Sequence, residues 1–204
     1  YAKYRVLHPL LKLNYKAFKL FNKVTPWTTQ ASIKTFDQIL TRDMVGFEYG
    51  SGFSTLYFAR RMKHVTSIEH NPVWFNLVNE KFKTLGVKNV SYQLIPPGQS
   101  NLVPYPFYEK FQLTKDDFQV REEYTDYFSA ILNYPDSHFD FIMVDGRARV
   151  ECCLLAIGKL KSGGIFVLDN SDRSRYRPVF QVLKNWKSVT TTTGLFDTTI
   201  WFKP

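Results

Sequence analysis

The sequence predicts an α/β fold with a doubly wound, mostly parallel sheet and helices on both of its faces. From residue 45 onward, short apolar β-rich runs alternate with helical stretches, as in parallel sheets with crossover helices. The first of these runs, 45–49, leads into a Gly-Ser-Gly turn. The last two, 188–193 and 198–202, can pair only as an antiparallel hairpin, because a parallel crossover needs about a dozen residues or more.

In chain order, five parallel strands and the terminal hairpin make seven strands. The parallel strands are expected at 45–49, 65–69, 90–95, 139–145 and 165–169. The helices are expected at 9–24, 31–40, 54–61, 72–85, 124–132, 149–160 and 175–186. Asn71-Pro72 favours a helix start, since Asn caps the helix and Pro suits its first position. Residues 96–121 fit no element, and insertions of that length are often lids.

The composition indicates one folded domain behind a basic segment. The 204 residues are 44% hydrophobic and 17% aromatic, which excludes intrinsic disorder, and no apolar run reaches the ~20 residues of a membrane span. The net charge is +9, but residues 1–34 hold seven basic side chains and no acid, so the rest is nearly neutral. We divide the chain into a basic helical segment, 1–40, and a domain, 41–204. A uniformly basic nucleic-acid-binding surface is not indicated.

The expected helix 9–24 is amphipathic. Its lysines fall on one face, and Leu10, Leu13, Ala17, Leu20 and Val24 fall on the opposite one. One interpretation is a flank packed on the domain with its lysines in solvent. The other is peripheral contact with an acidic membrane surface.

The cysteines, Cys152 and Cys153, are neighbours in an apolar run. Adjacent cysteines form poor disulfides and lack the spacing of a zinc site. We expect two small buried side chains in a reducing compartment, and therefore a cytoplasmic protein.

The strongest motif lies at the end of the first strand. Gly50 and Gly52 allow a sharp turn and close approach to a ligand, and Ser54 and Thr55 open a helix whose free N–H groups suit an anionic group. A dinucleotide motif would have a third glycine where Thr55 stands, whereas here Glu48 precedes the first glycine. This combination favours a cofactor with an amine and a carboxylate over a pyrophosphate.

Glu69 ends the second strand, 17 residues after Gly52. A carboxylate at that place can accept hydrogen bonds from both hydroxyls of a ribose. The alternative is a solvated acid at a strand end.

Together these residues resemble the class I S-adenosylmethionine-dependent methyltransferases over about residues 31–204. The resemblance implies a Rossmann-like sheet with strand order 3-2-1-4-5-7-6 and an antiparallel last strand. It places the methionine part of the cofactor against Glu48, Gly50, Gly52, Ser54 and Thr55. Glu69 would hold the ribose, and His70 would lie beside the adenine.

Two acids follow later strands. Asp145 ends the fourth strand, where it could bind the cofactor amine, act as a general base, ligate a metal or cap the next helix. Asp169 and Asn170 end the fifth. This set is similar to that of the metal-dependent catechol and caffeoyl-CoA type O-methyltransferases, which implies catalytic Asp145 and Asp169 and a Mg²⁺ site of Asp145, Asp169 and Asn170. The lysine expected shortly after the first Asp is absent.

The class of methyl acceptor is predicted from motifs that the sequence lacks. The N-P-P-Y-like motif of base and amide N-methyltransferases does not follow the fourth strand, and the cysteines lie on a helix. We therefore expect methyl transfer to an oxygen of a small molecule. One alternative is an RNA methyltransferase that uses the basic N-terminus. Another is a non-catalytic protein of this fold that binds an acidic membrane surface.

The insertion region, 102–127, is rich in aromatic residues, which suggests a lid over an apolar or sugar-like acceptor. The alternative is a surface loop that buries its own aromatic side chains. These residues are Tyr105, Phe107, Tyr108, Phe111, Phe118, Tyr124 and Tyr127.

Overall fold

The computed structural model describes residues 7–22, 24–98 and 106–204. Its centre is a seven-stranded sheet in the order β3-β2-β1-β4-β5-β7-β6. The strands are β1 Val45–Tyr49, β2 His64–Glu69, β3 Val90–Leu94, β4 Phe139–Val144, β5 Leu160–Asp169, β6 Lys187–Thr192 and β7 Asp197–Phe202. The pairs among β1 to β5 are parallel, and β7 is antiparallel to both β5 and β6. The predicted strand order and antiparallel last strand are confirmed.

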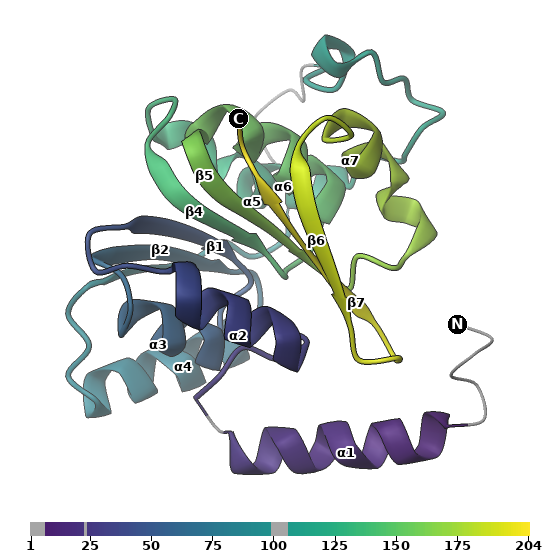
Figure 1. The fold of residues 1–204 in the computed structure, drawn as a ribbon. Helices are drawn as coiled ribbons and strands as arrows, with labels where there is room; N and C mark the ends of the chain where they lie inside the picture. Colours follow the sequence, from purple (N-terminus) through teal and green to yellow (C-terminus); the bar gives the residue numbers. More distant parts are fainter. Residues whose placement is uncertain (1–6, 23, 99–105) are drawn as a thin grey trace.

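Helices cover both faces of the sheet (Figure 1). One face packs against α2 Gln30–Ile39, α3 Phe53–Ala59 and α4 Pro72–Thr84, and the other against α5 Thr125–Ser129, α6 Arg149–Ala156 and α7 Arg177–Val182. Side chains of a strand alternate between the two cores: on β5, Phe166 belongs to the α6 side and Val167 to the α2 and α3 side. The doubly wound arrangement is therefore present.

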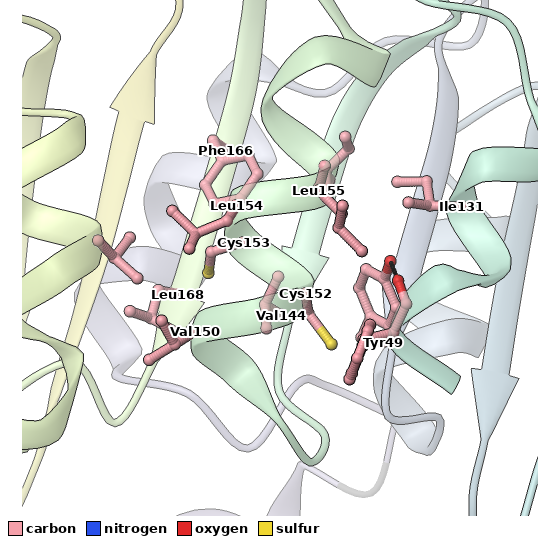
Figure 2. Packing of buried hydrophobic residues seen from close by; sticks show 14 of the residues in the cluster. Tyr49, Ile131, Val144, Val150, Cys152, Cys153, Leu154, Leu155, Phe166 and Leu168 are labelled. Carbon is pink, nitrogen blue, oxygen red and sulfur yellow. Dashed lines mark hydrogen bonds between the residues drawn. The ribbon is translucent and has the colours of Figure 1, made fainter. Parts of the chain in front are cut away.

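The cysteines belong to the core on the α6 side. Cys152 and Cys153 have no exposed surface and form no disulfide, and they pack among apolar residues of α6, β1, β4 and β5 (Figure 2). Burial raises the pKa of both thiols, so they are poor nucleophiles. The prediction of two small buried side chains is confirmed.

Several predicted boundaries are wrong. The helix expected at 149–160 ends at Ala156, and β5 begins at Leu160 rather than at residue 165. Gly163 has a φ of +75° and the β4–β5 register shifts nearby, so a strand with an irregularity occupies what looked like a loop. The α-helix expected at 175–186 covers only α7. Short 3-10 helices are η2 Glu109–Phe111, η3 Glu122–Tyr124, η4 Ala130–Asn133, η5 Ile157–Lys159 and η6 Ser174–Tyr176.

The N-terminal helix, α1 His8–Phe21, is shorter than predicted and has no buried residue. It touches the domain through Tyr15, whose ring lies edge-on to Phe196 at 5.2 Å, and through Phe18, which packs beside the α2 and α3 core. The expectation of a packed flank is therefore wrong for the leucine face, although Lys12 and Lys16 do face solvent. Three residues of the basic segment, Lys3, Arg5 and Lys23, lie outside the described residues.

Among the described residues, no helix combines the length and the apolar character that crossing a membrane requires.

Candidate active site

A cleft of about 780 Å³ lies at the carboxyl ends of the central strands. It runs from Gly50 and Glu69 past Asp145 and the start of α6 to Tyr176. A smaller pocket of about 130 Å³ lies over the glycine turn, and both cavities share Ser51, Trp74 and Asp145. In doubly wound sheets ligands bind at this edge, so these cavities form the candidate site.

The two glycines of the turn have different roles. Gly50 has a φ of +89°, and a Cβ there would lie 2.7 Å from backbone atoms of Gly146, so the turn lies directly against the chain after β4. Gly52 has extended backbone, and its Cβ would meet nothing closer than 3.8 Å. Since Gly52 lines the small pocket, its missing side chain leaves room there for a ligand.

Glu48 is fully buried beneath this turn. Its Oε2 accepts hydrogen bonds from the hydroxyls of Thr55 and Ser67, while Oε1 makes none within the described part of the chain. Burial raises the pKa of Glu48 to about 7, although the hydroxyls of Ser54, Thr55 and Ser67 oppose the shift. Glu48 forms no ion pair within the described residues and lines neither cavity, so its charge would attract a ligand ammonium through the turn rather than by direct contact.

The remaining predicted methionine-site residues divide between the pocket and the layer beneath it. Ser54 lines the small pocket. Thr55 is fully buried and lines neither cavity; its hydroxyl joins the Gly52 N–H to Glu48. Thr55 therefore holds the turn rather than facing a ligand.

Glu69 lies in the wall of the cleft and is held by its neighbours. Its Oε2 accepts from the N–H and hydroxyl of Ser51, and its Oε1 from the N–H groups of His70 and Asn71. Burial alone would raise the pKa of Glu69, but the hydrogen bonds from His70, Asn71 and Ser51 outweigh it and hold that pKa below its usual value. Glu69 is therefore an ionised acceptor at neutral pH.

His70 lines the cleft next to this carboxylate. Its Nδ1 lies 2.8 Å from Glu69 Oε1, and Arg147 Nε lies 3.4 Å from its Nε2. Its ring is edge-on to those of Tyr124 and Tyr127. Of these three rings, only that of His70 lines the cleft.

The structure joins Asp145 and Asp169 through Arg149, which the sequence analysis did not select. The guanidinium donates to Asp145 Oδ1 at 2.8 Å and to the carbonyls of Asp145 and Asp169, and it is only 9% exposed. Burial and the Asp145 charge raise the pKa of Asp169, whose Oδ1 accepts from Thr198. Asp169 also hydrogen-bonds to Asp145, so the two carboxyls are coupled and their pKa values are both raised by burial. The only sequence signal was the spacing of Asp145 and Arg149, one helical turn apart.

The predicted Mg²⁺ ligands do not fit a divalent cation in this arrangement. Asp145 is paired with Arg149, Asp169 accepts from Thr198, and the amide oxygen of Asn170 accepts from Arg173. A cation between them would lie against the Arg149 guanidinium. No group of three or more His, Cys, Asp or Glu residues with metal-binding geometry occurs in the described ranges.

An aromatic wall stands over the glycine turn, and no sequence pattern indicated it. The rings of Trp27, Phe53 and Trp74 lie 6.2–6.4 Å from one another and line the small pocket. Trp74 donates its indole N–H to the Ser51 carbonyl. Lys19 of α1 covers the Trp27 ring at 3.5 Å. Aromatic faces of this kind attract cations.

Several aromatic side chains of the described part of the insertion pack into the core. Phe107, Tyr108 and Tyr127 are buried in the core on the α6 side, so in the described part the loop buries its own aromatic side chains. Phe118 lines the cleft. Tyr105 lies outside the described residues.

Searches for a matching family model and for a matching curated protein found none. Solved structures do match. A Streptococcus mutans protein assigned as a methyltransferase, in complex with S-adenosylhomocysteine, is 12% identical, with a TM-score of 0.58 over 85% of this chain and 96% of that one. A Staphylococcus aureus protein assigned as a caffeoyl-CoA O-methyltransferase is 16% identical, with a TM-score of 0.54 over 100% of both chains. A Streptococcus thermophilus rRNA methylase is 13% identical, with a TM-score of 0.55 over 86% and 96%.

Proposed function

We propose that this chain, which has the fold of the class I S-adenosylmethionine-dependent methyltransferases, is such an enzyme and methylates an oxygen of a small molecule. The observation that carries the proposal is the cradle at the ends of β1 and β2. There an open glycine turn lies between a buried acid with a free oxygen, Glu48, and an ionised acid, Glu69.

Each part of this cradle suits one part of the cofactor. Glu48 would attract the ammonium of the methionine part from beneath the turn, and Gly52 and Ser54 would contact that part in the small pocket. Glu69 would accept hydrogen bonds from the ribose, with the Ser51 hydroxyl turning to make room. The bound cofactor supplies a methyl group on a sulfonium cation. The Trp27, Phe53 and Trp74 rings favour that cation and exclude water.

Asp145 is the group best placed to take a proton from an acceptor hydroxyl. It lines both cavities and is partly exposed, with 26% of its side chain accessible. Burial raises the pKa of Asp145, against the effect of Arg149, so its carboxylate is a stronger base than a solvated one. Arg149 and Asp169 would position Asp145 rather than contact the acceptor. The remaining work is alignment of the two reactants.

Oxygen as the methylated atom rests on two observations. The thiols of Cys152 and Cys153 are buried and protonated, so a cysteine-dependent carbon methylation is not favoured. The match to the Staphylococcus aureus protein assigned as an O-methyltransferase also favours an oxygen acceptor. Because the Asp145, Asp169 and Asn170 oxygens are already engaged, we expect turnover to withstand a chelator.

An RNA acceptor is the second candidate, and three arginines favour it. Arg147, Arg173 and Arg175 line the cleft, and none of them forms an ion pair with a carboxylate of the described residues. Guanidinium groups whose charge no carboxylate offsets suit phosphate oxygens. No local sequence pattern marks this group, unlike the lysines of the N-terminal segment. A steep salt dependence of RNA binding that is lost in the triple Ala variant would favour this candidate.

Calorimetry with S-adenosylmethionine and S-adenosylhomocysteine tests the central proposal. We expect both to bind the wild type, and Glu69→Gln to weaken binding about tenfold or more, because a charged acceptor is lost. Glu80→Gln is the control, because it removes the same carboxylate charge at an exposed position. Failure of the wild type to bind either compound would contradict the proposal and favour the non-catalytic alternative.

A further inference from the structure

α1 carries an apolar stripe that nothing in the described structure covers. Leu10, Leu13 and Leu20 are 65%, 66% and 68% exposed, and Phe21 is 86% exposed. At 100° per residue these four side chains fall within an arc of about 100°, the width of a packing face. Single exposed leucines are ordinary on protein surfaces, but four on one arc form a continuous patch.

The orientation of α1 is fixed by a different arc of the helix. Tyr15 packs edge-on against Phe196 and donates its hydroxyl to the Trp27 carbonyl, and Phe18 packs beside the α2 and α3 core. Lys19 lies over the Trp27 ring. Figure 1 shows α1 along one side of the molecule, near the turn between β6 and β7. With these contacts made, the apolar stripe is turned away from the domain.

The charge beside the stripe indicates what covers it. Lys12 and Lys16 are exposed on the arc next to the leucines, and residues 7–34 contain no acid. A second copy of the helix would bring two lysine rows together with no acid to pair them. An anionic bilayer satisfies both features, since apolar side chains enter the acyl boundary and ammonium groups remain among the headgroups.

We propose that α1 is an interfacial helix that docks this domain on an anionic lipid surface. Leu10, Leu13, Leu20 and Phe21 enter the bilayer interface, and Lys12 and Lys16 contact the headgroups. This inference goes beyond the proposed methyl transfer and does not depend on it.

Vesicle co-sedimentation of the full chain tests this. We expect binding to phosphatidylcholine vesicles that contain phosphatidylserine, and binding at least tenfold weaker to phosphatidylcholine alone. Leu13→Ser/Leu20→Ser should weaken binding at least tenfold, because two apolar side chains are lost from the interface. Lys12→Gln/Lys16→Gln should weaken it about fivefold for each lysine. The matched control is Leu132→Ser/Val189→Ser, which removes two exposed apolar side chains elsewhere and should leave binding unchanged.

Because the substituted α1 residues are exposed, thermal unfolding of the α1 variants should equal that of the wild type, which separates lost binding from lost folding. Binding by the leucine variant equal to that of the wild type would overturn the proposal. So would failure of the wild type to bind the anionic vesicles. A dimer in sedimentation velocity that the leucine variant abolishes, without lipid binding, would instead assign the stripe to a second copy of this chain.

Discussion

Two pairs of acids stand at the same edge of the sheet, but their partners differ. Glu48 and Glu69, at β1 and β2, are held by hydroxyl and backbone donors, with His70 beside Glu69. Asp145 and Asp169, at β4 and β5, contact each other and share the Arg149 guanidinium. Glu69 thus retains its negative charge, and Glu48, with a pKa raised to about 7, can ionise when a cationic ligand is bound. The charge of the second pair is offset by Arg149 within the protein, so this pair is suited to holding or moving a proton.

We expect the largest loss of stability from a substitution that removes the cation of the second pair. Arg149→Ala leaves Asp145 and Asp169 together without their cation, and loss of one partner from a buried ion pair costs about 3–5 kcal/mol. Urea unfolding followed by circular dichroism measures this. Arg147→Ala removes an exposed guanidinium two residues away and should stay within about 0.5 kcal/mol of wild type. A loss below about 1 kcal/mol for Arg149→Ala would show that the bridge is not structural.

A pH series examines the first pair. The pKa of Glu48 is about 7 in the folded protein and 4.5 in the unfolded chain, so between these values only the folded protein keeps the proton. The stability that neutral Glu48 contributes is complete below pH 4.5 and is lost as the pH rises through 7. At 1.36 kcal/mol per pH unit the loss is about 3 kcal/mol.

Glu48→Gln stays neutral at every pH. Its free energy of unfolding should therefore rise relative to wild type by about 3 kcal/mol between pH 4.5 and values above 7. Urea unfolding at a series of pH values gives this difference, and Glu80→Gln controls for the loss of one carboxylate. A difference that does not change with pH would mean that Glu48 is not buried as described.

We expect a smaller loss of stability from a substitution in the glycine turn, measured against the same substitution in an uncrowded turn. Gly50→Ala and Gly86→Ala both place a side chain at a positive φ, of +89° and +62°, so they share the same kind of backbone strain. Only at Gly50 does the new Cβ meet backbone, whereas at Gly86 nothing lies within 4 Å. Gly50→Ala should cost about 1–3 kcal/mol more in chemical unfolding. Equal costs would show that the contact with Gly146 is not tight.

The sequence predicted the first pair of acids better than the second. The glycine turn and Glu69 are readable because their signals are local: a strand, a turn and an acid at the next strand end. The Arg149 bridge joins the ends of two strands that are 24 residues apart, Asp145 and Asp169, and no local pattern marks it. From the sequence alone, Asp145 and Asp169 fit a metal site or acid–base catalysis equally, and nothing indicates the guanidinium between them.

The same limit explains the error at α1. Periodicity identified the leucine face correctly, but which face packs depends on tertiary partners. Tyr15 and Phe18 find Phe196 and the α2 and α3 core, and the leucines do not. The early start of β5 was missed for a related reason, since Gly163-Gly164 looks like a loop until the pairing with β4 and β7 is known.

The aromatic wall over the glycine turn has a practical consequence. Two of the four tryptophans in the chain, Trp27 and Trp74, line the small pocket with their rings 6.2 Å apart. Indole emission depends on the polarity around the ring, so the intrinsic fluorescence should report occupancy of the pocket without an added label. Because Lys19 of α1 covers Trp27, the same signal should also change when the helix meets a lipid surface. Tryptophan fluorescence thus reports both on the pocket and on lipid contact of α1. Trp27→Phe would separate the emission of Trp27 from that of Trp74.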